Sequence, residues 1–206
     1  MRSRLWKLRL IEVRSQVRGE EEEMLKMHFL NVGKGSSTII QFPGGRVGMV
    51  DIDDSQTIAE EQLASLAERM GIGLKYQIFR AWDAESGTGA KARELVEREY
   101  SIKLTDPIEY LAEFGIQDIF RFILTHPDMD HMSGLDRFYR HFYVQNFWDT
   151  ANDKEIPVDS WAGSPYRKED WDCYQDLRNS SENPKGLTIH RDETSDCCWV
   201  EDGIQI

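Results

Sequence analysis

An apolar segment that runs directly into a cluster of histidines and aspartates is the feature that most constrains this fold. Residues 118–125, DIFRFILT, are mostly branched or aromatic and predict a buried strand. The next six residues, HPDMDH at positions 126–131, are called the metal loop below. A buried strand that delivers a polar loop at its carboxyl end is a common way to build a site in α/β proteins. The candidate metal ligands on the loop are His126, Asp128, Asp130 and His131.

The elements expected around the metal loop alternate between strand and helix. Apolar residues at period two predict strands, and apolar residues at helical spacing with Gly or Pro at the ends predict helices. This alternation predicts an α/β (α+β) fold. The expected strands are 24–32, 37–42, 47–52, 118–125, 143–149 and 187–191, and the expected helices are 56–70, 89–100, 107–114, 133–142 and 168–178.

The length of 206 residues suits one domain or part of a larger one. Residues 1–23 differ from the rest, because six basic residues precede a run of four glutamates before the dense apolar pattern begins. We therefore predict a mobile extension over residues 1–23 and a folded domain over residues 24–206.

Charge and cysteine content limit the partners and the compartment. The net charge of −12 repels nucleic acid on average, although bound divalent metals can invert the field within one cleft. No apolar run approaches the roughly 20 residues of a membrane span, and the N-terminus lacks a secretory signal. Three cysteines without a CxxC pair are typical of reduced thiols. We expect a cytoplasmic protein with no membrane contact.

The spacing within the metal loop favours a two-metal site. Residues two apart in an extended loop point the same way, and a turn at residues 130–131 would divide the four side chains into two pairs. Imidazole and carboxylate together suit zinc, and also manganese or iron. The alternative is that Asp128 or Asp130 caps the following helix and the histidines are surface or core residues.

At this loop the sequence resembles the metallo-β-lactamase superfamily, whose signature is a strand ending in HxHxDH. It is most similar to the ComEC-like branch of DNA-uptake proteins. The similarity lies in HFLNVGKGSSTIIQFPGG (28–45), VGMVDI (47–52) and ILTHPDMDHMSGL (123–135). The resemblance implies an αββα sandwich, of which this chain would hold the N-terminal half and the start of the second half.

The resemblance also implies residue roles and an activity. His126 and Asp128 would bind one metal, and Asp130 and His131 a second, with zinc expected and manganese as the alternative. Asp130 would also touch the attacking water, and Asp51 would orient the loop from behind. The implied reaction is hydrolysis by a metal-activated water, with a phosphodiester of nucleic acid as the substrate.

The chain departs from the family pattern at several positions. Asp128 replaces the second motif histidine, and Asn31 and Ser36 replace acids of the opening loop. The further ligands that a second half supplies are not found, and His190 is interpreted as a surface residue at a strand end. Alternatives therefore remain: a hydrolase of a small ester, thioester or cyclic nucleotide, or a non-catalytic subunit that a homo-oligomer or a partner protein completes.

Two further patterns have competing interpretations. GKGSS at residues 33–37 fails the spacing of a nucleotide-binding phosphate loop and precedes a strand. Lys34, Arg46 and Arg137 could each contact phosphate or be an ordinary surface charge. The aromatic residues of 138–148 could stack on bases, but their spacing favours a core position.

Overall fold

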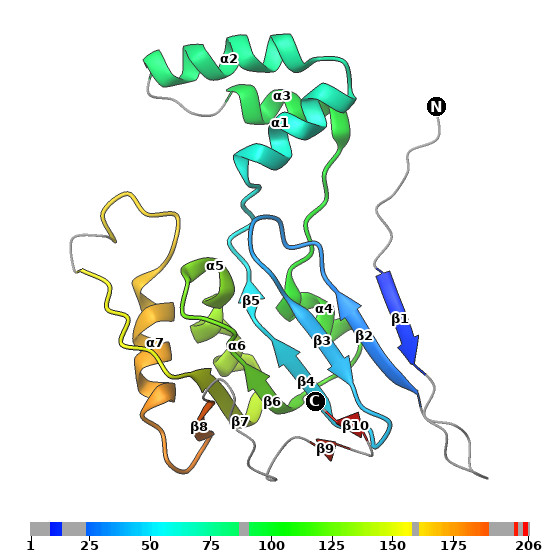
Figure 1. Ribbon diagram of the computed structural model, residues 1–206, viewed down its shortest axis with the longest axis vertical. Helices are drawn as coiled ribbons and strands as arrows, with labels where there is room; N and C mark the ends of the chain where they lie inside the picture. Colours follow the sequence, from blue (N-terminus) through cyan, green and yellow to red (C-terminus); the bar gives the residue numbers. More distant parts are fainter. Residues whose placement is uncertain are drawn as a thin grey trace. The chain divides into compact units, whose positions relative to one another are not determined.

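A seven-stranded mixed sheet carries the metal loop in this computed structural model, which describes residues 9–13, 24–86, 91–157, 161–189, 200–201 and 204–205 (Figure 1). The strand order is β1-β2-β3-β4-β6-β7-β8. Strands β1 to β4 are antiparallel neighbours, whereas β4, β6, β7 and β8 run parallel. The strands are β1 Arg9–Val13, β2 Leu25–Phe29, β3 Thr38–Gln41, β4 Val47–Val50, β6 Asp118–Ile123, β7 Tyr143–Thr150 and β8 Lys185–Ile189.

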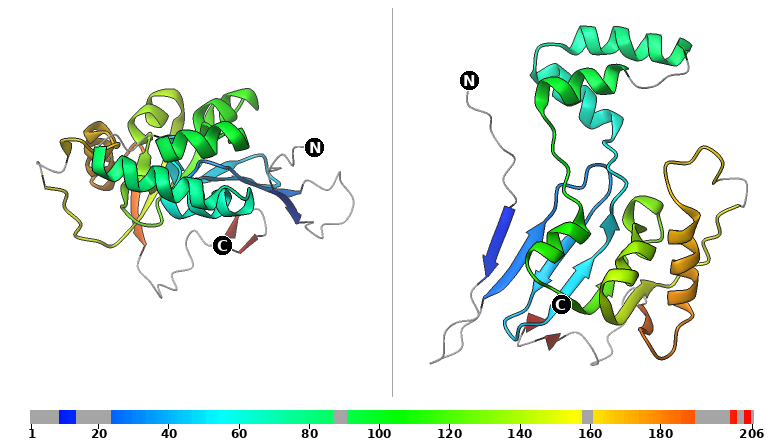
Figure 2. Two further views of the ribbon diagram at one scale, coloured as in Figure 1. Left: turned by 90° about the horizontal axis from the view of Figure 1, so that it is seen from above. Right: turned by 180° about the vertical axis from the view of Figure 1, so that it is seen from behind.

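Four helices pack on this sheet: α4 Pro107–Glu113, α5 Met129–Met132, α6 Leu135–His141 and α7 Lys168–Arg178. Figure 2 shows α4 and α6 on the same face of the sheet. The core between the layers is aromatic, because Phe122 of β6 lies 5.3 Å from Phe138 of α6 and 6.0 Å from Phe147 of β7 between ring centroids. All three side chains are fully buried. The predicted α/β class is confirmed, and Phe138 and Phe147 belong to the core.

The parallel pairing of β4 and β6 places two chain segments at one edge of the sheet. Register pairs Val50 with Ile123, so both strands end together. Asp51 follows β4 and donates its backbone N–H to the Ile123 carbonyl at 2.9 Å. The short strand β5, Ile52–Asp53, then forms bridges to Met132 and Ser133, which follow the metal loop. The metal loop is therefore held at the carboxyl edge from both sides.

Residues 56–104 form a second compact unit, distinct from the unit made of residues 1–55 and 105–206. It consists of three helices, α1 Glu60–Arg69, α2 Gly73–Ser86 and α3 Lys91–Tyr100. Buried Leu63, Ala67, Tyr76 and Val96 form its core. Residues 72–87 show no clear periodicity in the sequence, yet most of them form α2.

The termini of the described chain are strands. Strand β1, within the predicted extension, pairs antiparallel with β2 from Arg9 opposite Phe29 to Val13 opposite Leu25. Strands β9, Val200–Glu201, and β10, Ile204–Gln205, pair with each other. Within the described residues, no helix has the length and apolar character needed to cross a bilayer.

His28 of β2 gives the fold an acid-sensitive position. Its ring is buried beside Tyr110 of α4 and Phe114, which follows α4, and its Nδ1 lies 2.8 Å from the Tyr110 hydroxyl. Burial lowers the pKa of His28 below its ordinary value of 6.5. The unfolded chain therefore binds this proton more readily, and the free energy of unfolding should fall as the pH drops below about 6.5.

Urea denaturation at pH 5.5 and pH 7.5 checks this expectation. The His28→Gln variant should lose less stability on acidification than the wild type, because residue 28 no longer titrates. The control is His141→Gln, since His141 is exposed on α6. Equal pH dependence in the wild type and His28→Gln would contradict the prediction.

Candidate metal centre

Asp51 is the residue around which the site is organised. Its backbone adopts a left-handed conformation with φ of 56°, unusual for a residue with a side chain. Its buried carboxylate accepts from the Thr125 backbone N–H at 2.8 Å, from the Thr125 hydroxyl at 2.7 Å and from the Ser36 hydroxyl at 2.9 Å. His131 Nδ1 lies 2.7 Å from the same carboxylate. These four residues, Asp51, Ser36, Thr125 and His131, are called the Asp51 network below.

The Asp51 network orients both histidines of the metal loop. A carboxylate only accepts, so the proton of His131 lies on Nδ1 and Nε2 keeps its lone pair. The Thr125 hydroxyl donates to Asp51, so its oxygen is free to accept from His126 Nδ1, 3.0 Å away. His126 therefore also presents Nε2. Metal-bound histidines are typically held this way, with the second ring nitrogen donating to a carboxylate or another oxygen.

The helix-cap alternative for the aspartates is wrong. Helix α5 begins at Met129 with Asp128 at the cap position, but the Asp128 side chain makes no capping hydrogen bond. Helix α6 has Gly134 at its cap position with φ of 92°, so Asp130 does not cap it either. The two carboxylates are left to other partners.

The four predicted ligands come together only in part. The rings of His126 and His131 are 3.8 Å apart between centroids, and His126 Nε2 lies 3.5 Å from Asp128 Oδ2. Asp130 Oδ2 faces Lys34 Nζ at 3.6 Å. Among the described residues, no three His, Cys, Asp or Glu side chains are arranged to hold a metal ion.

Each carboxylate of the metal loop instead faces a lysine. Lys154 is ion-paired with Asp128, and this pairing lowers the pKa of Asp128. Lys34 is hydrogen-bonded to the Tyr166 hydroxyl and paired with Asp130, and both contacts, the Tyr166 bond most, raise the pKa of Lys34. The two lysines thus offset the negative charge of the two neighbouring carboxylates. A divalent cation would offset the same charge.

The donor set fits a divalent metal. Two imidazoles with available Nε2 atoms and two partly exposed carboxylates are the nitrogen and oxygen ligands that zinc and manganese accept. A metal site requires imidazoles that are held in a fixed orientation, and the Asp51 network provides that orientation. The residues that would hold the metal are His126, Asp128, Asp130 and His131.

A glycine-containing turn, residues 33–35, presses directly on the metal loop and is called the GKG loop below. A Cβ at Gly35 would lie 1.9 Å from the Asp130 carbonyl oxygen and 2.6 Å from Asp53 Cβ. The Gly35 N–H donates to buried Asp53 at 3.0 Å, and burial raises the pKa of Asp53. The backbone of the GKG loop therefore lies in close contact with the metal loop.

The three residues predicted as candidate phosphate contacts have different surroundings in the structure. Arg137 is paired with Asp106 at 2.6 Å and with Asp54 at 3.5 Å. Arg46 stacks on Phe120 with its guanidinium 4.5 Å from the ring centroid. Of these three, Lys34 is the one in contact with the metal loop.

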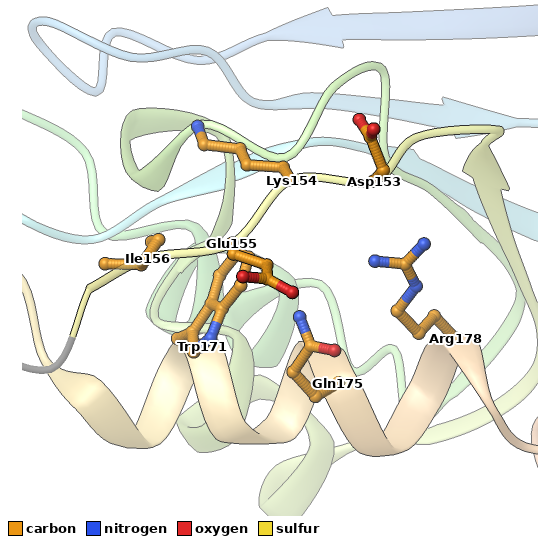
Figure 3. A pocket seen from close by; sticks show the side chains of 7 residues that line it. All are labelled: Asp153, Lys154, Glu155, Ile156, Trp171, Gln175 and Arg178. Atoms are coloured by element: carbon orange, nitrogen blue, oxygen red, sulfur yellow. The ribbon is translucent and has the colours of Figure 1, made fainter.

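A cavity of about 400 Å³ lies beside the segment that carries Lys154. Figure 3 shows Gln175 and Arg178 projecting from α7 toward residues 153–156, while Lys154 extends away from α7. Lys154 connects this cavity to Asp128 of the metal loop. The lining residues are Asp153, Lys154, Glu155, Ile156, Trp171, Gln175 and Arg178.

Sequence reasoning missed several residues of the site. Ser36 lies within GKGSS and Thr125 directly precedes His126, so their place in or beside these motifs was the available signal. Lys154 carried no signal, because it contacts Asp128 from 26 positions away. His190 lies outside the described residues.

The metal loop at the carboxyl end of β6 carries two oriented imidazoles and two carboxylates. These side chains form a candidate metal site in an α/β protein. The family model of the metallo-beta-lactamase superfamily matches residues 85–205, more than half of the chain. The chain belongs to the metallo-beta-lactamase superfamily. No curated protein and no solved structure matches it significantly. Membership indicates a metal-dependent hydrolase, and the superfamily usually binds divalent metals such as zinc.

Proposed function

We propose that this protein is a metal-dependent hydrolase of the ComEC-like branch that cleaves phosphodiesters of nucleic acid. The observation that carries the proposal is the Asp51 network, which orients His131 directly and His126 through Thr125. A protein gains little from fixing two adjacent imidazoles by one buried carboxylate unless their free nitrogens bind something. A divalent metal is the ligand that matches them.

The metal loop would divide its ligands between two ions. His126 and Asp128 are the pair for the first, and Asp130 and His131 the pair for the second. When bound, two adjacent divalent ions lower the pKa of a shared water and offset the charge of an anionic substrate. Asp130, whose side chain is 22% exposed, would accept a hydrogen bond from the attacking water. Asp51 holds the His131 imidazole in the orientation that the site requires.

The phosphodiester assignment rests on the resemblance at residues 28–45 and 123–135 and on the charge beside the loop. Lys34 and Lys154 are cations at the two loop carboxylates in a chain of net charge −12. Each lysine is paired with a loop carboxylate, so its charge favours an anionic substrate over a neutral ester or thioester once a metal engages that carboxylate.

A second candidate function is a non-catalytic subunit that needs a second copy or a partner protein to complete the site. The observation favouring it is that each loop carboxylate is already neutralised by a lysine. In that case the protein would bind no zinc by itself at neutral pH.

Metal analysis with a paired variant tests the proposed hydrolase. The wild type, dialysed against zinc, should retain up to two ions and hydrolyse single-stranded DNA more efficiently than p-nitrophenyl acetate. The double variant His126→Ala with Asp130→Ala should lose zinc binding and hydrolysis by more than about 100-fold, because one ligand of each pair is gone.

The matched control removes the same residue types from α6. Asp136 and His141 lie outside the metal loop, so the double variant Asp136→Ala with His141→Ala should keep zinc binding and activity. Full hydrolysis by the His126→Ala, Asp130→Ala variant would rule out the proposed function.

A further inference from the structure

Lys34 is placed at the metal loop by the shape of the GKG loop. Gly33 adopts φ of 101°, a conformation that favours glycine, and Gly35 leaves no room for a Cβ against the Asp130 carbonyl. The backbone of Lys34, which lies between these two glycines, is therefore held close to the metal loop. Its side chain is 47% exposed, so the ammonium is accessible to a ligand.

Tyr166 supplies a second polar group beside the Lys34 ammonium. Lys34 Nζ donates to the Tyr166 hydroxyl oxygen at 3.3 Å and lies 5.8 Å from the centroid of its ring. The hydroxyl oxygen accepts this bond, so the Tyr166 O–H remains able to donate elsewhere. An ammonium and a phenol hydroxyl at hydrogen-bond distance from each other form a pair of donors suited to one anionic oxygen pair.

The partner of Lys34 on the metal loop explains how this pair is held. Lys34 Nζ is 3.6 Å from Asp130 Oδ2, a separation for an ion pair that is partly exposed and therefore weak. Asp130 is also one of the proposed metal ligands. Once its carboxylate is engaged by a cation or removed, the Lys34 ammonium loses a competing anion and is available to a ligand.

We propose that Lys34 and Tyr166 form an anion subsite for one phosphodiester group, with Asp130 as the internal anion that occupies Lys34 in the metal-free chain. The inference rests on the proposed function for its substrate class, but the subsite itself is built from contacts within this chain. Lys34 and Tyr166 are positioning residues that bind the phosphodiester beside the metal ligands.

A titration without metal tests the subsite. Dimethyl phosphate, a phosphodiester monoanion, is added to the metal-free full chain, and its dissociation constant is measured by ³¹P NMR. Asp130→Asn should bind the probe about five-fold more tightly than the wild type, because Lys34 is released from its carboxylate. The double variant Asp130→Asn with Lys34→Gln should lose this gain, and Asp130→Asn with Tyr166→Phe should lose part of it.

A lysine with similar exposure provides the control. Lys168 is 50% exposed and pairs with Asp172 on α7. Asp130→Asn with Lys168→Gln should therefore keep the gain. Asp130→Asn with Lys34→Arg should also keep most of it, because the positive charge remains.

The outcomes separate the subsite from the proposed hydrolase. A gain that persists when Lys34 is replaced, or no gain in Asp130→Asn, overturns the subsite whether or not the protein binds zinc. A Lys34-dependent gain supports the subsite, and the proposed hydrolase is then decided by zinc retention in the His126→Ala, Asp130→Ala experiment.

Discussion

Replacing Asp51 by asparagine is expected to weaken zinc binding by about 10- to 100-fold. Asparagine tolerates the left-handed backbone of this position better than most residues with a side chain, so the chain conformation should be retained. The carboxamide nitrogen would donate to His131 Nδ1, where the carboxylate accepts. The His131 proton would then move to Nε2, and the lone pair that binds a metal would be lost.

Zinc titration by isothermal calorimetry measures the effect, with urea denaturation reporting the stability of the same samples. Asp51→Ala should weaken zinc binding to a similar extent and should also destabilise the fold, because alanine is strained at this φ and leaves the Thr125 and Ser36 donors unsatisfied.

The matched control is Asp83→Asn in the helical unit. Asp83 is also a buried aspartate that accepts a backbone hydrogen bond, from Ala92 N–H at 2.9 Å. Its replacement should leave zinc affinity unchanged. Zinc affinity unaffected in Asp51→Asn would show that this network does not orient the ligands.

Local sequence patterns predicted the elements that position the metal loop. Helix α7 spans Lys168–Arg178, as the apolar spacing of 168–178 indicates. Helix α4 begins after Asp106, whose carboxylate accepts from the N–H groups of Ile108 at 2.8 Å and Glu109 at 3.2 Å. Periodicity and caps are properties of neighbouring residues, so a single sequence contains them.

Strand order and long-range contacts were not accessible in the same way. The neighbouring parallel strands β4 and β6 are far apart in the sequence, because the whole helical unit lies between them along the chain. Nothing in the sequence of either strand specifies the other as its partner. The contact of Lys154 with Asp128 likewise depends on how the chain after β7 returns past the metal loop. These features follow from tertiary packing, which periodicity does not encode.

The candidate site shows the same division. The spacing of HPDMDH predicted candidate ligand types, and the resemblance placed Asp51 behind them, where its carboxylate is 2.7 Å from His131 Nδ1. The pairing of both loop carboxylates with lysines was not predicted, because an ion pair between distant residues has no signature in composition or spacing. Candidate metal ligands could thus be predicted from the sequence, but the pairing of their carboxylates with nearby lysines required coordinates.

Replacing Gly35 by alanine is expected to destabilise the protein by about 2–3 kcal/mol and to weaken zinc binding at the same time. The added Cβ would meet the Asp130 carbonyl oxygen at 1.9 Å and Asp53 Oδ2 at 2.6 Å. The carbonyl is backbone, so it cannot rotate away as a flexible side chain does. Either the GKG loop or the metal loop must shift, and a shift of the metal loop moves His131 away from Asp51 and Asp130 away from Lys34.

Urea denaturation and zinc calorimetry on the same preparations check both parts of this prediction. The control is Gly73→Ala at the first residue of α2, where the nearest atom to an added Cβ is the flexible Glu68 Cγ at 3.2 Å. That variant should change stability by less than about 1 kcal/mol and leave zinc affinity intact. If Gly35→Ala were as stable as Gly73→Ala and bound zinc normally, the GKG loop could not be in close contact with the metal loop, and the placement of Lys34 beside Asp130 would lose its structural basis.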